Sequence, residues 1–120
     1  MSDRRFDSFE EFWPFYVLEH TKPETQALHV AGTALGLTAA AAAVATRNGW
    51  LVPLGLAAAY GAAWYSHYRI ENNRPASFKY PVYSFLADFK MVGRVVQGRM
   101  SDEVRAAQAL ANQARTIEMS

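Results

Sequence analysis

The sequence of 120 residues contains no cysteine. This absence excludes disulfide bonds, zinc–thiolate sites, iron–sulfur clusters and a thiol nucleophile. Any metal ion must therefore be held by histidine, carboxylate or water. An excess of one charge is also missing, because twelve Lys and Arg residues accompany eleven Asp and Glu residues and the formal net charge is +1. No nucleic-acid partner is expected, since phosphate binding needs a concentrated basic surface.

Charge is also absent from two long internal stretches. Residues 28–46 carry no formal charge when His29 is neutral, and residues 50–68 carry none when His67 is neutral. At about 1.5 Å per residue, a helix of either length approaches the thickness of a bilayer core. The polar turn 47–49 joins the two stretches. The pattern predicts a membrane-embedded helical hairpin with helices of about 28–46 and 50–68.

The distribution of positive charge predicts how this hairpin is oriented. Eleven of the twelve Lys and Arg residues lie outside it, on the side of both termini, and Arg47 alone lies at the turn. By the positive-inside rule, both termini face the cytoplasm. We therefore expect an integral protein with two spans in a bacterial inner membrane. The first residues lack the basic start and apolar run of a signal peptide, so insertion is expected through the hairpin.

A soluble alternative remains open for the same stretches. Alanine is only weakly hydrophobic, and the mean hydropathy of the chain is slightly negative. An Ala-rich hairpin buried inside a helical bundle would show a similar pattern. Small residues recur four apart along both stretches, as Gly32 with Gly36 and Gly55 with Ala59. This spacing allows helix backbones to approach closely and is compatible with a homodimer.

Amphipathic helices flank the hairpin in an all-α, single-domain chain of residues 1–120. Ser8 and Glu11 fit a capping box before a helix of about 9–19, whose aromatic face suits packing in a bundle or a membrane interface. Pro23 predicts a loop between that helix and the hairpin.

Two further helices are predicted after the hairpin. Pro81 opens a helix of about 81–97, and a more polar helix of about 102–117 follows Ser101, its expected cap. The first of them carries an apolar stripe formed by Val82, Phe85, Leu86, Phe89, Val92 and Val96.

The chain has only three histidines, and their positions are related. His29 lies nineteen residues before Asn48 and His67 nineteen residues after it, so both have the same height in an antiparallel hairpin. His20 precedes His29 by nine residues and can fold back to that level. Glu71 follows His67 by four residues, on the same face of a helix. Singly, each histidine could simply bond a carbonyl, but together these residues predict a metal site for Fe(II), Zn or Mn.

Two sequence stretches resemble a known family. They are H-T-K-P-E-T-Q-A-L-H-V-A-G-T, from His20, and W-Y-S-H-Y-R-I-E-N-N-R-P-A-S-F-K-Y-P, from Trp64. Both are similar to the Mpo-like family, long catalogued as domain of unknown function 962, and the resemblance covers about Phe12 to Met91. A yeast member is a membrane-embedded, iron-dependent 2-hydroxy fatty acid dioxygenase of fatty acid α-oxidation. The resemblance implies Fe(II), dioxygen, membrane lipid and a fatty-acid substrate.

Position by position, the resemblance implies a ligand set. It marks His20, His29 and His67 as iron ligands, and Glu71 as a further ligand or catalytic hydrogen-bonding partner. Asp88 falls where the family tends to have an acidic residue. We expect it either to orient a ligand histidine or to be a solvated charge on a helix face.

The motif after Glu71 is expected to bind the substrate. Asn73, Arg74 and Lys79 are the candidates, with Arg74 also a catalytic candidate, because the two cations could attract a fatty-acid carboxylate. They could equally contact lipid headgroups or set the topology. Two other functions stay open: a non-catalytic membrane protein whose histidines bind headgroups or a partner, and a metal-binding helical protein that acts on another lipid.

Overall fold

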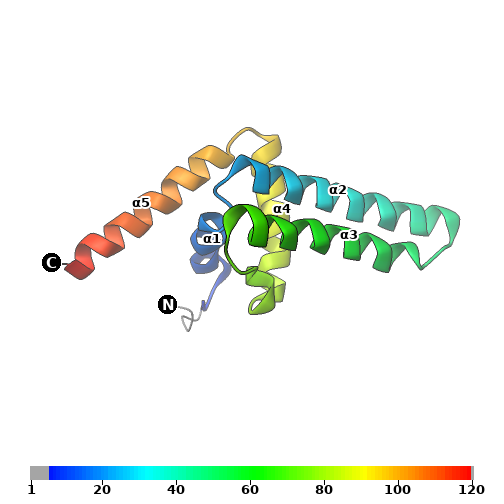
Figure 1. The fold of residues 1–120 in the computed structure, drawn as a ribbon, viewed down its shortest axis with the longest axis horizontal. Helices are drawn as coiled ribbons and strands as arrows, with labels where there is room; N and C mark the ends of the chain where they lie inside the picture. The colour runs from blue at the N-terminus through cyan, green and yellow to red at the C-terminus, as the bar shows by residue number, and fades with distance from the viewer. Residues whose placement is uncertain (1–5, 120) are drawn as a thin grey trace. The chain divides into compact units, whose positions relative to one another are not determined.

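A computed structural model describes residues 6–119, which form helices and no β-strand (Figure 1). This confirms the predicted all-α class. In chain order the elements are α1 (Phe9–Leu18), α2 (Pro23–Thr46), α3 (Leu51–Tyr65), the π-helix η1 (Ser66–Glu71), the 3₁₀-helix η2 (Ala76–Phe78), α4 (Pro81–Val96) and α5 (Met100–Met119).

The helices group into two compact units. The hairpin unit comprises Lys22–Pro75 and contains α2, α3 and η1. The terminal unit comprises the described residues through Thr21 together with those from Ala76 onward, and contains α1, η2, α4 and α5. The single domain predicted over 1–120 stays a prediction.

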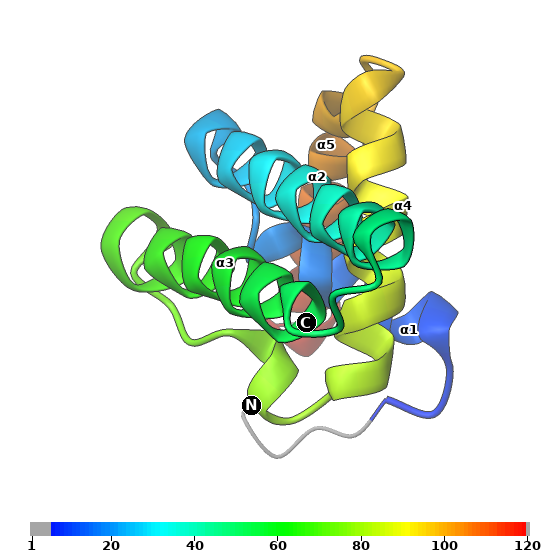
Figure 2. The same cartoon turned by 90° about the vertical axis from the view of Figure 1, so that its right-hand side faces the viewer.

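In the hairpin unit, α2 and α3 lie side by side (Figures 1 and 2). The loop predicted between the first helix and the hairpin is present but shorter than expected, because α2 begins at Pro23 and not near residue 28. Proline at the first helical position loses no hydrogen bond, and its fixed φ suits the helix. At the other end Arg47 adopts the left-handed conformation with φ 56°, and Asn48 N donates to Ala43 O at 3.0 Å. This turn leads directly into α3.

Small residues bring the two hairpin helices together. A Cβ built on Gly55 would lie 2.5 Å from Ala39 Cβ, and one on Gly32 would lie 3.1 Å from Ala59 O. The predicted close approach is therefore found inside the hairpin. Around Gly61, by contrast, a Cβ would meet nothing within 4 Å. A homodimer stays a prediction.

The second leg of the hairpin departs from regular α-helix. α3 ends at Tyr65 and continues as the π-helix η1, which ends at Glu71 and is followed by Asn72 with φ 60°. Within residues 6–119, α2 alone is long and apolar enough to cross a membrane by length and composition, while α3 has 15 residues. The structure thus supports one candidate span, not the predicted two. Large exposed apolar side chains of the hairpin unit are Leu35, Leu37, Val44, Trp50, Val52, Leu54, Leu56, Trp64, Tyr65 and Tyr68.

In the terminal unit, the aromatic face of α1 forms the core. Phe12, Trp13 and Tyr16 are buried together with Met91 of α4 and Ala107 of α5. Of the two interpretations offered for this face, the structure supports packing. The predicted cap is present, since Glu11 N donates to Ser8 Oγ at 3.2 Å. The Glu11 carboxylate closes the motif one residue early, on Asp7 N at 3.3 Å.

The apolar stripe predicted on α4 is not its packed face. Phe85 and Phe89 are 50% and 42% exposed, whereas Ser84, Ala87 and Met91 are buried. The bulky rings of α1 need small or flexible residues opposite them, and alanine, serine and methionine meet that need. The larger side chains of α4 are consequently left on the outside.

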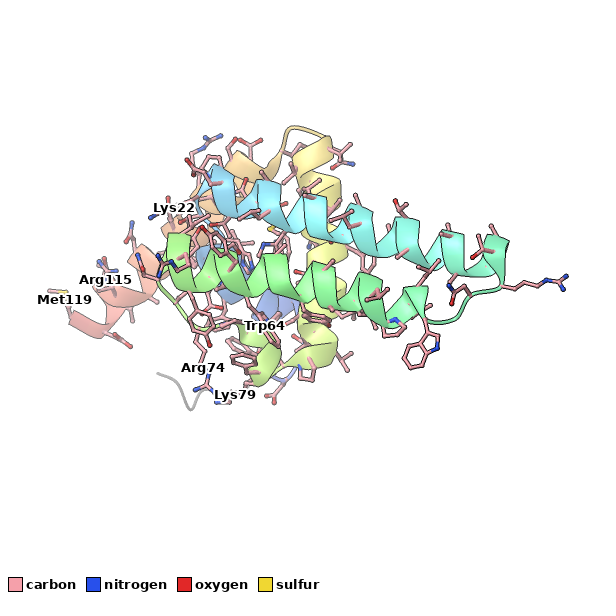
Figure 3. All side chains as sticks on the ribbon, turned by 45° about the vertical axis from the view of Figure 1, so that its right-hand side comes forward. Lys22, Trp64, Arg74, Lys79, Arg115 and Met119 are labelled. Atoms are coloured by element: carbon pink, nitrogen blue, oxygen red, sulfur yellow. The ribbon has the colours of Figure 1, made fainter. Side chains whose placement is uncertain are left out.

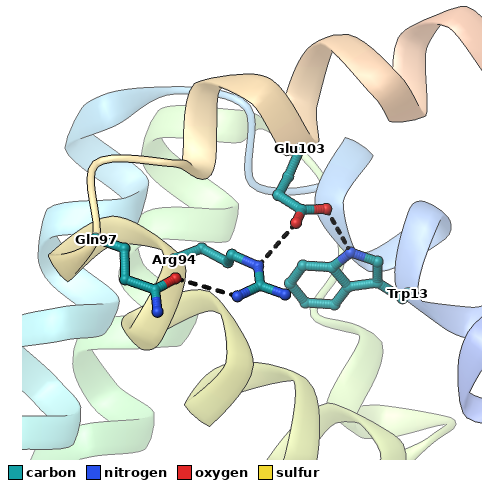
Figure 4. A network of polar contacts seen from close by, with 4 residues as sticks. All are labelled: Trp13, Arg94, Gln97 and Glu103. Carbon is teal, nitrogen blue, oxygen red and sulfur yellow. Dashed lines mark hydrogen bonds and ion pairs between the residues drawn. The ribbon is translucent and has the colours of Figure 1, made fainter.

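A polar network anchors the start of α5 (Figure 4). Trp13 Nε1 donates to Glu103 Oε1 at 2.9 Å, and Arg94 Nε donates to Glu103 Oε2 at 2.8 Å. Arg94 also donates to Gln97 Oε1 at 3.1 Å, and Lys90 Nζ lies 4.4 Å from the Trp13 ring centroid. Burial alone would raise the pKa of the Glu103 carboxyl, but the bonds from Trp13 and Arg94 outweigh it, and the pKa lies below its ordinary value.

Candidate metal centre

His29 of α2 and His67 of η1 meet inside the hairpin unit. Both are buried, with 4% and 3% of their surface exposed, and their ring centroids lie 5.3 Å apart with the rings nearly perpendicular. The predicted common height of these two histidines is therefore confirmed. Two imidazoles on one ion, with metal–nitrogen bonds of about 2.1 Å, have centroids about 5 Å apart. The pair fits a shared metal ion.

His29 is held by its own helix. Its Nδ1 lies 2.9 Å from Thr25 O, one turn earlier in α2, and 3.4 Å from Ser66 Oγ. A carbonyl oxygen can only accept a hydrogen bond, so Nδ1 carries the proton. In the neutral ring the lone pair is then on Nε2, which is the nitrogen that can bind a metal.

His67 is held by the residues that follow it. Its Nδ1 lies 2.7 Å from Asn73 Oδ1, and Asn73 N donates to His67 O at 2.8 Å. The chain turns back at Asn72, whose positive φ is tolerated by asparagine better than by most other residues. The amide oxygen of Asn73 accepts, so His67 also carries its proton on Nδ1 and its lone pair on Nε2.

His20 lies in the terminal unit, just after α1, and is 1% exposed. Its Nδ1 donates to Tyr16 O at 2.6 Å, and its ring stacks on that of Tyr16 with centroids 4.0 Å apart. The Tyr16 hydroxyl donates to Asp88. Burial first, and the Asp88 carboxylate second, raise the pKa of Tyr16 well above its ordinary value, so it stays a neutral donor. Asp88 is thereby linked to His20 through Tyr16.

All three histidines share one tautomer. In each, an oxygen acceptor fixes the proton on Nδ1 and directs the lone pair to Nε2, as is usual for metal-ligating histidines. The three buried side chains form a donor set that could hold a metal ion. Among the described residues this set does not include Glu71. Two of the acceptors, Tyr16 O and Thr25 O, are backbone carbonyls four residues before their histidine, which every residue type provides, so the sequence holds no signal for them.

Glu71 makes a contact that the sequence did not indicate. Its Oε2 accepts a hydrogen bond from Lys22 N at 2.8 Å, and Lys22 Nζ donates to Ile70 O at 2.9 Å. Lys22, labelled in Figure 3, precedes the first residue of α2, so the Glu71 carboxylate lies at a helix N-terminus, where negative charge is stabilising. The α-helical face expected for His67 and Glu71 is wrong, because both belong to a π-helix.

The candidate substrate-binding residues differ in exposure. Arg74 and Lys79 are exposed and extend from the ribbon in Figure 3. Asn73 is half-buried, and its side-chain oxygen is engaged by His67.

Comparison with known proteins gives a family for this chain. A family profile described as 2-hydroxy-palmitic acid dioxygenase Mpo1-like matches residues 6–100. The chain belongs to the Mpo1-like family. The match includes all three histidines and the residues that hold them, and it ends where α5 begins. No curated protein and no solved structure matches the chain.

Proposed function

We propose that this chain is an Fe(II)-dependent dioxygenase that shortens 2-hydroxy fatty acids by one carbon. The observation that carries the proposal is the set of three buried histidines, in each of which an oxygen atom lies at hydrogen-bonding distance from Nδ1 and Nε2 is left for a metal ion. Membership of a family described by a 2-hydroxy-palmitic acid dioxygenase supplies the substrate class.

The donor set suits a catalytic iron ion better than a structural metal ion whose ligands all come from the protein. Three neutral imidazoles with no thiolate leave coordination positions for other ligands, and imidazole is a normal ligand of non-haem Fe(II). Iron bound there would supply the redox chemistry that lets dioxygen react with the 2-hydroxy acid. Glu71 remains a candidate for an additional ligand or hydrogen-bonding partner. The protein's own contribution is to hold three Nε2 atoms in a buried environment.

The reaction balances without an external reductant. One 2-hydroxy acid and one dioxygen give a carboxylic acid one carbon shorter, carbon dioxide and water. The carbon–carbon bond between C1 and C2 is broken, C2 is oxidised to the new carboxyl carbon, C1 leaves as carbon dioxide, and dioxygen takes up all four electrons. Oxygen consumed and acid formed should therefore be equal in amount.

An amphiphilic substrate suits the surface of the hairpin unit. Exposed Leu35, Leu37 and Leu54 make the outside of α2 and α3 apolar, and such a surface fits acyl chains better than water. We propose that the hairpin is embedded in the membrane, its second leg formed by α3 and η1 together, with both termini cytoplasmic. Arg74 and Lys79 are proposed to attract the substrate carboxylate.

Elemental analysis combined with oxygen uptake tests this function. Purified wild-type protein should contain close to one iron per chain and should consume dioxygen with 2-hydroxypalmitate, releasing pentadecanoate in equal amount. His67→Ala should lose both, while Asn48→Ala, a change at the exposed hairpin turn, should lose neither.

Two results would contradict the proposal. Full activity in metal-free protein would exclude the iron mechanism. If the wild type binds no metal, and a variant lacking all three histidines still folds and inserts normally, the chain would instead be a non-catalytic membrane protein. Extraction without detergent would separately exclude the embedded hairpin.

A further inference from the structure

We propose that Asn73 is a positioning residue that fixes the orientation and tautomer of His67. The inference rests on the proposed function, because it concerns one ligand of the same donor set. It changes the expected role of Asn73, which the sequence placed among the substrate-binding residues. The carrying observation is the pair of bonds between the two residues, Nδ1 to Oδ1 at 2.7 Å and backbone N to O at 2.8 Å.

The imidazole of His67 needs a side-chain acceptor to fix its orientation. The backbone carbonyl that would correspond to the acceptors of the other two histidines is already occupied. His20 and His29 each bond the carbonyl four residues earlier. The equivalent carbonyl for His67 is Ala63 O, which already accepts from Ser66 Oγ at 2.6 Å and from Ser66 N. The π-helix begins at this point, so the regular α-helical spacing is lost as well. His67 is therefore oriented from its C-terminal side.

The turn after the π-helix is what brings Asn73 back to His67. Asn72 adopts a left-handed conformation with φ 60°, which reverses the chain in one residue. Asn73 N then reaches the carbonyl of His67, and its side chain reaches the ring of the same residue. Main chain and side chain together close a small ring of contacts. The two consecutive asparagines thus have different tasks, Asn72 to make the turn and Asn73 to hold the imidazole.

The consequence is that one ligand can be perturbed without the others. Carbonyl acceptors cannot be removed by mutation, so His20 and His29 keep their orientation in any variant of residue 73. Removal of such a partner typically lowers metal affinity about 10- to 100-fold. An aspartate at residue 73 would still accept from Nδ1, so Asn73→Asp should rescue what Asn73→Ala loses.

The test is ¹⁵N NMR of metal-free protein labelled at histidine, in detergent. In the wild type, all three rings should show a protonated Nδ1 and an unprotonated Nε2. Asn73→Ala should change the signals of one ring, assigned to His67 by their absence in His67→Ala, and leave the other two. Asn73→Asp should keep the wild-type pattern. Cobalt(II) titration, followed by absorbance, should show the 10- to 100-fold loss of affinity in Asn73→Ala and its recovery in Asn73→Asp.

The outcomes separate this inference from the proposed function. A wild-type His67 with its proton on Nε2 would overturn the inference, even if Asn73→Ala failed to fold. An unchanged His67 signal in a folded Asn73→Ala would also overturn it. A His67 tautomer that changes in Asn73→Ala would uphold the role of Asn73. If the wild-type protein at the same time neither binds iron nor consumes dioxygen, the proposed dioxygenase activity would be contradicted.

Discussion

The rings of His29 and His67 face each other nearly at right angles, with centroids 5.3 Å apart, although they come from the two legs of the hairpin. If both bind one ion, their contributions to metal affinity are coupled. We expect His29→Ala and His67→Ala each to abolish tight cobalt binding, and the double variant to be no weaker than either single one, because neighbouring groups are not additive. Equilibrium titration of the four proteins measures this. Additive losses would mean two separate sites.

The contact between Gly55 and Ala39 predicts a strong effect of a small substitution. In Gly55→Ala the new Cβ would lie 2.5 Å from Ala39 Cβ, so the helices must separate. Overpacking of this kind costs about 1–3 kcal/mol. Gly61→Ala is the matched control, since its Cβ meets nothing within 4 Å and alanine favours helix by about 1 kcal/mol. Thermal unfolding of both variants should shift in opposite directions, and a stable Gly55→Ala would contradict the packing.

The sequence predicted those parts of the structure that depend on regular periodicity. Counting residues from Asn48 placed His29 and His67 at the same height because the chain is helical on both sides of the turn, so equal numbers of residues span nearly equal lengths. It failed where one residue changes the geometry. Pro23 separates the first two helices as expected but is itself the first residue of α2, and the π-helix after Tyr65 alters which side chains share a face.

The packed face of α4 could not be predicted from hydrophobicity for a different reason. The rings of α1 select small partners, so Ala87 is buried while Phe85 is half exposed. Hydrophobic periodicity identifies an apolar stripe but not which neighbour covers it. The role of Asn73 was likewise hidden, because it depends on a turn that only the three-dimensional structure shows.

The anchoring of α5 through Glu103 should weaken in acid. The folded-state pKa of Glu103 lies below its ordinary value of 4.5, so its stabilising contribution is present above that pH and is lost as the pH falls through the lower folded value. We expect a contribution below about 1 kcal/mol, because the pair is partly exposed. Denaturant unfolding followed by circular dichroism at several pH values between pH 6 and pH 3 should show it. Glu103→Gln should remove this part of the pH dependence, whereas Asp102→Asn, at an exposed pair, should retain it.

The exposed stripe of α4 is expected to contact lipid. Phe85 and Phe89 lie on the outside of the terminal unit, and their rings pack against each other with centroids 5.1 Å apart. Replacement of both by serine should leave the unfolding temperature nearly unchanged, because neither ring is in the core. A fluorescent probe attached at Phe89→Cys should be quenched by brominated phospholipid, a local signal that does not depend on how the hairpin holds the chain in the membrane. Met91→Ser, on the buried face, should instead lower the unfolding temperature. A probe at residue 89 that brominated phospholipid does not quench would exclude lipid contact by this stripe.

Tyr16 contacts Asp88 through its hydroxyl and His20 through its ring. We therefore expect the hydroxyl to affect stability and the ring to affect both stability and metal binding. Tyr16→Phe keeps the ring that stacks on His20 but removes the hydroxyl donor to Asp88, so it should cost about 1–3 kcal/mol of unfolding free energy. Metal affinity should fall little, because His20 Nδ1 bonds the Tyr16 carbonyl, which every residue at this position provides. Tyr16→Ala should weaken both stability and metal binding, because the imidazole loses its stacking partner. Calorimetric unfolding and cobalt titration of the two variants distinguish these effects. Equal metal affinity in Tyr16→Phe and Tyr16→Ala would show that stacking does not position His20.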